Sequence, residues 1–290
     1  MALMPSFVSL LDALWIRDST TTEGECAKLT KGLTPEQMVH VNQAKDVTLG
    51  DKTEVIASRT FTAGLGTLTV TRKDMRTMNA GEWLNDGMVN FTIGIMADRE
   101  LARCGGAGAQ PRVHFCNTFF VDKLRSDGKD EVCGWTKKKK LGYDMLNCHK
   151  VIMPVHQNGS HWTLVVMDLV DKKVYYYDSL RGNDSKLTGQ LVSWIVKEYE
   201  NKRKVIMEEN VWTIEVPNDI PRQMNGYDCG VFMCKYADYI ATGCPLSFGQ
   251  SDIEYFRLRI TSDAFEQGKE AVQVGEEGED AGEEVEIIEP

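Results

Sequence analysis

Apolar residues recur at intervals of three and four in several stretches of the chain, which is the spacing that places them on one face of a helix. This pattern predicts helices over 7–16, 35–45 and 187–203, a helix that begins at Asn85 or Asp86, and a helix that follows Asp228 and reaches Ile240. The 35–45 helix has a typical start, with Thr34 as the cap, Pro35 at the first position and Gln37 at the third. Residues 17–31 lack the pattern, and we expect a loose polar stretch there.

Runs rich in β-branched and aromatic residues predict strands over 68–71, 161–168, 173–178 and 211–216, and a strand or buried run over 113–120. The runs 161–168 and 173–178 are separated by a short turn, so a hairpin is expected. Antiparallel pairing would make His161, at the start of the first run, a cross-strand neighbour of Asp178, at the end of the second. Strands interleaved with helices predict an α+β or α/β protein.

The chain has 290 residues, which is enough for one large domain or two small ones. Its net charge is −10, but eight acidic and no basic residues lie in 275–290, and without them 35 acidic residues face 33 basic ones. The acidity therefore belongs to the tail, which we expect to be disordered.

Eight cysteines are too few for a disulfide scaffold of this length, and no C-x-x-C pair points to zinc. The N-terminal apolar run carries Asp12 and lacks a basic region before it, so it is not a typical signal peptide. No window approaches the roughly 18 apolar residues of a membrane span. We therefore expect a reduced, intracellular, soluble protein with no cofactor, no metal and no membrane partner.

The segment from Pro221 to Ile240 carries the strongest chemical signal. A turn-rich stretch leads to Asp228, a good N-cap, and then to Cys229 in the first turn of the predicted helix, where unpaired N–H groups and the helix dipole favour a thiolate. Gln223 could place its amide beside the sulfur as an oxyanion donor. Gly230 would let a substrate backbone approach closely. A buried, inert cysteine behind a helix cap is the alternative interpretation.

A histidine and a carboxylate complete a possible catalytic set. His161 could act as general base and acid, and Asp178 could hold the imidazole in one tautomer. Taken singly, His161 is more typical of a surface histidine and Asp178 of a turn residue. Together with Cys229 and Gln223 they predict hydrolytic cysteine chemistry.

These residues resemble the ubiquitin-like-protein-specific cysteine proteases, the SUMO (sentrin) proteases. The resemblance rests on His161-Trp162, on Tyr177-Asp178-Ser179 and on the run from Gln223 to Gly230, in that order. It extends to further motifs at family spacing, in 68–74, 83–86, 117–120, 135–138 and 234–238, and covers about 31–265. It implies an α+β fold of the papain-like cysteine protease superfamily in the adenain-like arrangement, with a central mixed sheet flanked by helices.

By this resemblance, His161, Asp178 and Cys229 are the catalytic triad and Gln223 helps to form the oxyanion hole. The family cleaves after the C-terminal Gly-Gly of SUMO, in precursors and at isopeptide bonds to lysine. Trp83 and Trp162 match two tryptophans that cover a narrow tunnel for the diglycine, because only residues without side chains pass between two indoles. Core packing is the alternative role of each tryptophan.

Three further positions match family surfaces that touch SUMO. Asp86 matches a carboxylate that pairs with a basic residue of SUMO, although it could also cap a helix. Trp135 and Lys137 match a second contact surface. The chain departs from the family pattern in two places: the segment 157–160 is one residue longer than expected, and 64–66 lacks an aromatic residue.

The resemblance predicts three domain segments, an N-terminal extension over 1–30, a catalytic domain over 31–265 and an acidic tail over 266–290. The expected partner is SUMO or a related modifier with its conjugates, without nucleic acid, and the protein is expected to be a monomer in the nucleus rather than the cytoplasm. A protease for a Nedd-type modifier, an acyltransferase of the bacterial-effector kind and an inactive SUMO-binding adaptor are the alternatives.

Two segments outside the expected catalytic core have possible binding roles. The lysines of 137–140 form a basic face that could contact SUMO or direct nuclear import. The segment Val285-Glu286-Ile287-Ile288 resembles a SUMO-interacting motif, which adds a strand to a sheet edge. An acidic solubilising tail is the alternative for this last segment.

Overall fold

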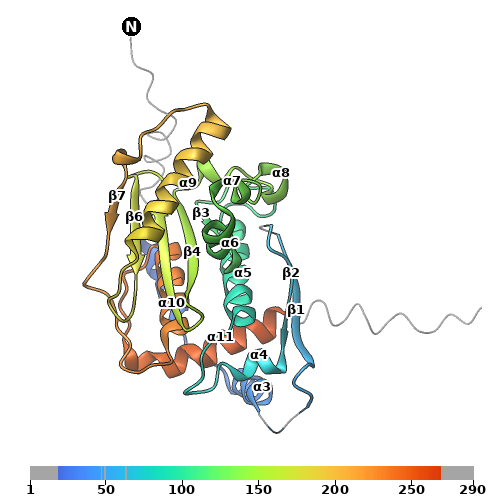
Figure 1. Cartoon of the computed structure of the whole chain (residues 1–290). Helices are drawn as coiled ribbons and strands as arrows, with labels where there is room; N and C mark the ends of the chain where they lie inside the picture. The colour runs from blue at the N-terminus through green and yellow to red at the C-terminus, as the bar shows by residue number, and fades with distance from the viewer. Residues whose placement is uncertain (1–18, 47, 49, 63, 269–290) are drawn as a thin grey trace, which may run out of the picture.

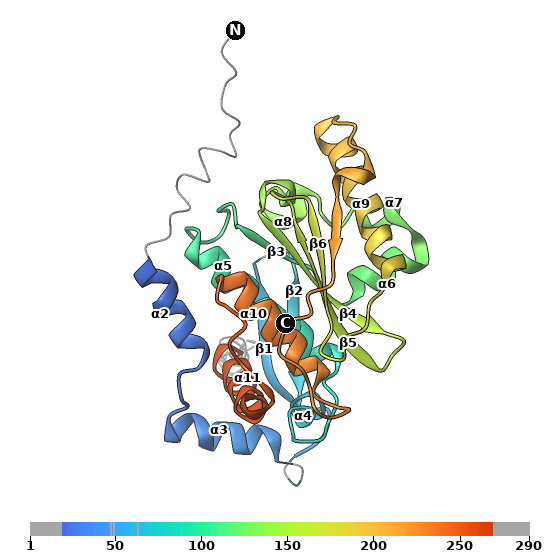
Figure 2. The same cartoon turned by 90° about the vertical axis from the view of Figure 1, so that its left-hand side faces the viewer.

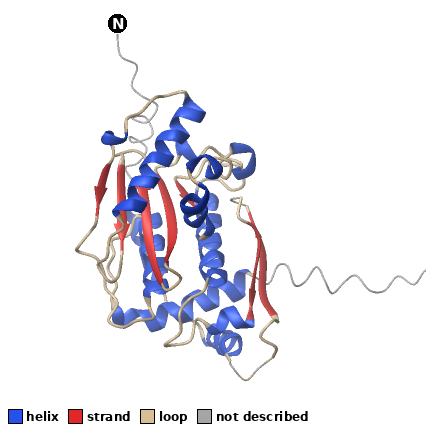
Figure 3. Ribbon diagram, viewed as in Figure 1, coloured by secondary structure: helices blue, strands red, loops and turns tan. Residues whose placement is uncertain are grey.

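Five strands form a central mixed sheet in the order β3-β4-β5-β6-β7, and a two-stranded antiparallel sheet, β1-β2, lies apart from it (Figures 1 and 3). The computed structural model describes residues 19–46, 48, 50–62 and 64–268. The strands are β1 (Val55–Phe61), β2 (Gly66–Thr71), β3 (Val113–Phe115), β4 (Lys150–Gln157), β5 (His161–Asp168), β6 (Lys173–Tyr177) and β7 (Thr213–Glu215). Strands β3 and β7 pair in parallel with their neighbours, and the other pairs are antiparallel.

Helices cover both faces of the five-stranded sheet. They are α2 (Ser19–Leu29), α3 (Pro35–Lys45), α4 (Arg72–Arg76), α5 (Asp86–Arg103), α6 (Phe119–Asp127), α7 (Lys129–Val132), α8 (Lys138–Leu141), α9 (Ser185–Arg203), α10 (Cys229–Thr242) and α11 (Ile253–Gln267), with short 3-10 helices η1 (Met145–Asn147), η2 (Glu209–Val211) and η3 (Gln250–Asp252). Figure 2 shows α9 and α6 on one side of the sheet, α5 and α10 on the other, and α11 and α3 beyond them. The mixed sheet flanked by helices that the sequence predicts is confirmed.

The hairpin of β5 and β6 is present as predicted and sets the positions of two site residues. Leu164 pairs with Tyr177, so in the same register position 178 faces Thr163. His161 therefore meets Asp178 on the diagonal rather than directly across the hairpin. A diagonal pair remains close enough for two long polar side chains to touch.

Strand β4 lies between β3 and β5 although it contains Pro154, which lacks the N–H that a central strand donates. The parallel pairing with β3 covers only Lys150–Ile152 of β4. At Pro154 the strand therefore has a partner on the β5 side alone, where Pro154 faces Leu164. The proline sits where β4 has become an edge strand, which explains why the sheet tolerates it.

Helix α10 runs through the hydrophobic core, and its residues are buried on nearly every side. It packs mainly against β5, and α5 and α11 lie beside it. The α5 helix begins as predicted, with Asn85 as the cap that accepts a hydrogen bond from the amide of Met88. The α3 helix has the predicted capping box of Thr34 and Gln37. Because α10 is buried on nearly every side, the core holds it rigidly and its first residue has a fixed position.

The N-terminal part of the described chain differs from the sequence expectation. The stretch 17–31 was expected to be loose, but Ser19–Leu29 forms α2, and α2 packs against α10. Cys26 on α2 and Cys244 just after α10 form a disulfide. The expectation of a fully reduced chain is therefore wrong for this pair, because folding brings together two cysteines that are 218 residues apart.

Two expectations fall on residues that the structure does not describe. The helix expected over 7–16 lies outside the described residues, and so do the acidic tail from 269 onward and its segment Val285–Ile288. The expected domain boundaries stay a prediction.

Candidate active site

Cys229 is the first residue of α10, and the loop before it carries other residues of the candidate site. The helix begins where predicted, and the carbonyl of Asp228 accepts hydrogen bonds from the amides of Val231 and Phe232, both at 3.0 Å. The carboxylate of Asp228 forms no side-chain cap. Its predicted capping role is wrong, because this carboxylate pairs with Arg257 instead. Cys229 nevertheless occupies a helix N-terminus, where N–H groups and the dipole favour an anion.

His161 and Asp178 form the predicted pair, with 2.7 Å between His161 Nε2 and Asp178 Oδ1. The buried carboxylate also accepts hydrogen bonds from the amides of Leu180 at 2.8 Å and Gly182 at 2.9 Å. Burial raises the pKa of Asp178, but the hydrogen bonds from His161 and from the two amides outweigh burial and hold this pKa below its ordinary value. Asp178 is therefore an ionised acceptor in a fixed position.

Cys229 lies within hydrogen-bond reach of the same imidazole. The hydrogen bond with Asp178, followed by the one with Cys229, raises the pKa of His161 from 6.5 to about 9. Because Nε2 faces Asp178, Nδ1 is the ring nitrogen that is left to face the sulfur. At neutral pH the imidazole is thus protonated and can serve as the positive partner of a thiolate. The structure brings together the three residues of the predicted triad.

Access to these atoms is narrow. Cys229 is only 2% exposed, and its partner His161 keeps 21% of its side chain exposed. A buried thiol beside a partly exposed imidazole suits a slender substrate that reaches the sulfur end-on rather than a bulky side chain.

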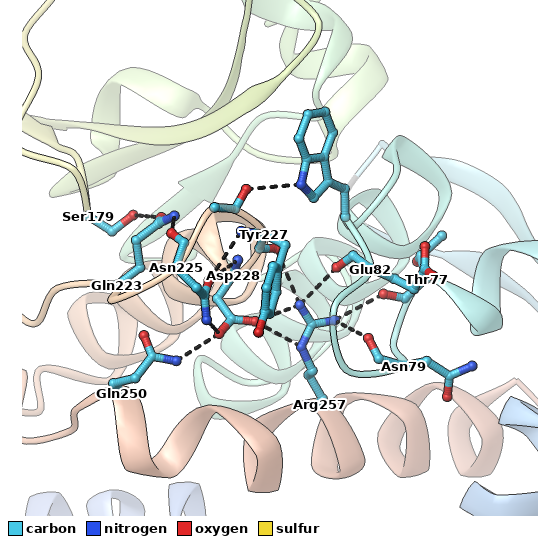
Figure 4. Close-up of polar contacts among 12 residues, drawn as sticks. Thr77, Asn79, Glu82, Ser179, Gln223, Asn225, Tyr227, Asp228, Gln250 and Arg257 are labelled. Carbon is cyan, nitrogen blue, oxygen red and sulfur yellow. Dashed lines mark hydrogen bonds and ion pairs between the residues drawn. The ribbon is translucent and has the colours of Figure 1, made fainter.

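Gln223 is buried in the loop before Cys229, and both ends of its amide are engaged (Figure 4). Its Oε1 accepts a hydrogen bond from the hydroxyl of Ser179 at 2.6 Å, and its Nε2 donates to the carbonyl of Asn225 at 2.6 Å. An amide carries two hydrogens on nitrogen, so one remains for a further acceptor. Since Ser179 follows Asp178 directly, Gln223 is tied to the chain segment that carries the carboxylate. Its oxyanion role stays a prediction.

The two tryptophans differ sharply in exposure. Trp83 is 52% exposed, and its Nε1 donates to the carbonyl of Gly226 at 3.0 Å, in the loop that leads to the cysteine. Trp162 is 2% exposed; it donates to the carbonyl of Leu84 at 2.8 Å and stacks on His156 at 4.1 Å. Only Trp83 thus presents an exposed ring beside the cysteine loop, and the tunnel role of the pair stays a prediction.

The structure gives a different reason for a glycine at position 230 from the one expected from the sequence. A Cβ atom at this position would lie 2.8 Å from Cβ of Leu84 and 3.1 Å from Cδ1 of Trp162. The space beside Gly230 is therefore filled by the protein itself, not kept open for a substrate backbone. The glycine allows α10 to pack closely against the Trp83-Leu84 segment and β5.

The remaining predicted contact residues lie on other elements. Asp86 is the first residue of α5 and is half-buried, and the cap of this helix is Asn85. Trp135 follows α7; it packs against Phe120, and the ammonium of Lys140 lies over its ring. None of the contacts of Trp135 found in the described part of the chain joins it to Cys229. Both SUMO-contact roles stay predictions.

No motif in the sequence pointed to Arg257, whose side chain is 3% exposed and whose guanidinium contacts the loop before Cys229. Its helix, α11, was not predicted. The signal was available in the spacing of the buried positions of this helix, which are Ile253, Phe256, Arg257, Ile260, Thr261, Ser262 and Ala264. An arginine within such a face needs several buried acceptors, so it marks a polar site inside the core.

No group of three or more metal-ligating side chains occurs within 19–46, 48, 50–62 and 64–268. In the same residues, no helix is both long enough and apolar enough to cross a bilayer.

Comparison with known proteins supports a common origin for this site and its fold. The sequence model of the Ulp1 protease family, C-terminal catalytic domain, matches residues 82–272. Ubiquitin-like-specific protease 1A of Arabidopsis thaliana is 34% identical over 246 residues, which cover 79% of this chain and 47% of that protein. Sentrin-specific protease 2 of Homo sapiens is 34% identical over 202 residues, which cover 69% of this chain and 33% of that protein. The chain thus spans half or less of these relatives.

Solved structures show the same fold. The C-terminal Ulp1 protease domain in complex with Smt3, the yeast ortholog of SUMO, matches with a TM-score of 0.66 and 24% identity, covering 82% of this chain and 98% of that one. The Ulp1-like SUMO protease catalytic domain of Chaetomium thermophilum matches with a TM-score of 0.68 and 24% identity, covering 83% and 92%. The fold class expected from the resemblance is confirmed.

Proposed function

Because the chain belongs to the Ulp1 protease family, we propose that it is a cysteine peptidase that cleaves after the C-terminal Gly-Gly of SUMO, in precursors and in isopeptide conjugates with lysine. The observation that carries the proposal is the contact of His161 with both Asp178 and Cys229. The substrate is supported by the names of the relatives, which are ubiquitin-like-specific and sentrin-specific proteases.

In the proposed mechanism, the thiolate of Cys229 attacks the carbonyl carbon of the terminal glycine, and its electron pair forms the C–S bond. The carbonyl oxygen becomes an oxyanion, which the free amide hydrogen of Gln223 stabilises. His161 then donates its Nδ1 proton to the leaving amine, and the C–N bond breaks to give a thioester. In the second half, His161 removes a proton from water and the hydroxide adds to the thioester carbonyl. The C–S bond then breaks, which releases the carboxylic acid of the modifier and the thiolate of Cys229. Asp178 stabilises the imidazolium throughout.

The narrow access to Cys229 suits a diglycine. A chain without side chains can pass beside the exposed ring of Trp83 and above the buried ring of Trp162. Asp86 and Trp135 are the proposed contacts with the folded body of the modifier, Asp86 through a basic residue of SUMO. A substrate with side chains at these two positions would collide with the indoles and be excluded.

The decisive experiment is labelling with SUMO that carries a C-terminal vinyl sulfone, followed by mass-spectrometric mapping of the modified cysteine. We expect one adduct, on Cys229, with the other free thiols unmodified. Parallel probes made from a Nedd-type modifier and from ubiquitin define the substrate. Faster labelling by the Nedd-type probe would overturn the SUMO assignment and leave the peptidase assignment intact.

The variant Cys229→Ser separates an enzyme from an adaptor. We expect it to bind SUMO but to release no product from a SUMO precursor, because a hydroxyl is a poor nucleophile beside an imidazolium. Wild-type protein that binds SUMO but hydrolyses neither precursor nor conjugate would identify a SUMO-binding adaptor. Processing by Cys229→Ser would mean that the nucleophile is a different residue.

We further propose that the protein acts in the nucleus rather than the cytoplasm. The support is the run of four lysines over 137–140, all exposed, three of them on α8. Replacing them with alanine in a fluorescent fusion should shift the protein to the cytoplasm, and an unchanged distribution would contradict this role. Disulfides are uncommon in nuclear proteins, so the state of Cys26 and Cys244 in cells is a second test.

A further inference from the structure

Arg257 on α11 binds two separate loops with one guanidinium group (Figure 4). Its Nε and Nη2 donate to Oδ1 of Asp228 at 3.1 and 2.7 Å. The remaining donors reach four backbone carbonyls, those of Thr77 at 3.0 Å, Asn79 at 3.0 Å, Glu82 at 2.9 Å and Tyr227 at 3.3 Å. Every N–H of this buried side chain is therefore used, which is the geometry that a planar guanidinium supplies and an ammonium does not.

The first of the two loops, 77–82, leads directly into Trp83, and the second, 223–228, leads directly into Cys229. Arg257 joins them from the α11 side. The hydrogen bond from Trp83 Nε1 to the carbonyl of Gly226 joins them a second time. The exposed indole and the nucleophile are thus connected by two bridges, one through Arg257 and one through Gly226.

Asp228 is fixed on its second oxygen as well. Its Oδ2 accepts hydrogen bonds from Nδ2 of Asn225 and from Nε2 of Gln250, both at 2.7 Å. The amides of Tyr227 and Asp228 in turn donate to Oδ1 of Asn225, both at 3.1 Å. The carboxylate that precedes the cysteine therefore acts as an anchor for the loop on one side and for Arg257 on the other.

We propose that Arg257 is a positioning residue for the substrate channel: with Asp228 it fixes the distance between the ring of Trp83 and the sulfur of Cys229. The inference rests on the proposed function, since the channel is the slot through which the diglycine reaches the thiol. Arg257 does not touch the triad, so its loss leaves the Cys229–His161 pair in place. Its loss changes the slot and not the nucleophile.

The test compares two reactions of the same thiol. The first is hydrolysis of SUMO that carries C-terminal aminocoumarin, which needs the channel. The second is alkylation of Cys229 by iodoacetamide, which needs only the reactive sulfur and is followed as a function of pH. The variant Arg257→Lys keeps the positive charge but cannot reach all the acceptors. The matched control is Arg259→Lys, on the same helix, where Arg259 pairs with Asp263 at 2.9 Å within α11.

We expect Arg257→Lys to lower kcat/KM for the SUMO substrate by roughly 10- to 100-fold, since small misplacements outside the reacting atoms have effects of this size. The alkylation rate and its pH profile should stay within about twofold of wild type, because a Lys residue preserves the charge next to Asp228. Arg259→Lys should change neither reaction. Measurements are made well below the melting temperature of each variant, so that the folded fraction is the same.

A purely structural role predicts a different result in the folded variant, in which both reactions fall by the same factor or neither changes. Either outcome for Arg257→Lys would overturn the proposal. Should that variant not fold, Asp228→Asn decides, because it preserves the shape of the side chain and removes the charge-assisted pair. Hydrolysis should then fall by a much larger factor than alkylation, and an equal fall in both would overturn the proposal. A wild-type protein that hydrolyses no modifier refutes the proposed function instead, so the two failures are distinguishable.

Discussion

The variant Asp178→Asn tests the electrostatic core of the site. The carboxylate contributes most to raising the pKa of His161 to about 9. A hydrogen bond to a charged group contributes about 1.5–3 kcal/mol, which equals about 1–2 pKa units at 1.36 kcal/mol per unit. The amide of Asn cannot reproduce the contacts, because its NH2 group must face either the amide of Gly182, 2.9 Å from Oδ2, or Nε2 of His161, 2.7 Å from Oδ1. In the first arrangement the NH2 group faces the N–H of Gly182, so two donors oppose each other. In the second it donates to Nε2 of His161, which leaves the imidazole proton on Nδ1, the wrong tautomer.

The assay is kcat/KM for SUMO-aminocoumarin between pH 6 and 10. In the wild type, activity should fall as the pH rises through about 9, because His161 then loses the proton that it gives to the leaving group. In Asp178→Asn this alkaline limb should move to about pH 7–8, so that deprotonation of His161 alone costs up to about fourfold at pH 7.5. The wrong tautomer should lower activity further at every pH. The control is Asp168→Asn at the opposite end of β5, where the buried carboxylate binds Lys150 at 2.6 Å. It should lower stability and leave the limb unmoved. An alkaline limb that stays near pH 9 in Asp178→Asn would refute this account of His161.

Three further changes test separate parts of the structure. Gly182→Ala adds a Cβ that overlaps Oδ2 of Asp178, so kcat/KM should fall roughly tenfold or more and stability by about 1–3 kcal/mol. The control is Gly189→Ala on α9, where nothing lies near the added Cβ, and it should raise the melting temperature slightly. Trp83→Ala should reduce SUMO hydrolysis far more than stability, since the ring is mostly exposed and loses one hydrogen bond; a large fall in melting temperature with full activity would contradict the channel. Reducing the Cys26–Cys244 disulfide should lower the free energy of unfolding by about 2–4 kcal/mol. Thermal unfolding with and without reductant measures this change, and identical unfolding curves would show that the bond does not form in solution.

The parts of the fold that the sequence predicts well are those specified by neighbouring residues. The capping box of Thr34 and Gln37 lies within four residues, and the structure contains both of its hydrogen bonds. The β5–β6 hairpin is also local, because a short turn fixes its register. From the hairpin alone the meeting of His161 and Asp178 could be predicted, although their diagonal placement depends on the actual register. The approach of Cys229 could not, since it depends on how α10 packs against β5.

Where the sequence prediction failed, partners distant in the chain decide the local structure. Strand β4 was not predicted from the sequence. It tolerates its proline because β3 ends before it, and no pattern within β4 shows where a neighbouring strand ends. Helix α2 has a weak apolar pattern of its own. It packs against α10, and its Cys26 forms a disulfide with Cys244. Asp228 has the sequence context of an N-cap, yet Arg257 takes its carboxylate across a separation of 29 residues. A charged partner in the core outcompetes the local amides, because an unpaired buried guanidinium costs far more than a missing cap.

The pairing of Asp228 with Arg257, in place of a side-chain cap, affects how the site is built. A side-chain cap would have fixed Asp228 to its own helix and left the loop 223–228 without a connection to 77–82. The bond to Arg257 connects the two loops, and α10 still begins correctly because the backbone carbonyl of Asp228 accepts from Val231 and Phe232. The start of the helix is thus held by backbone and core packing, and the carboxylate is available to set the distance between the loop that carries Trp83 and the loop that carries Cys229. In the proposed function the thiol, imidazole and carboxylate carry out the reaction, and we expect the Asp228–Arg257 pair to position the channel through which a chain end reaches them.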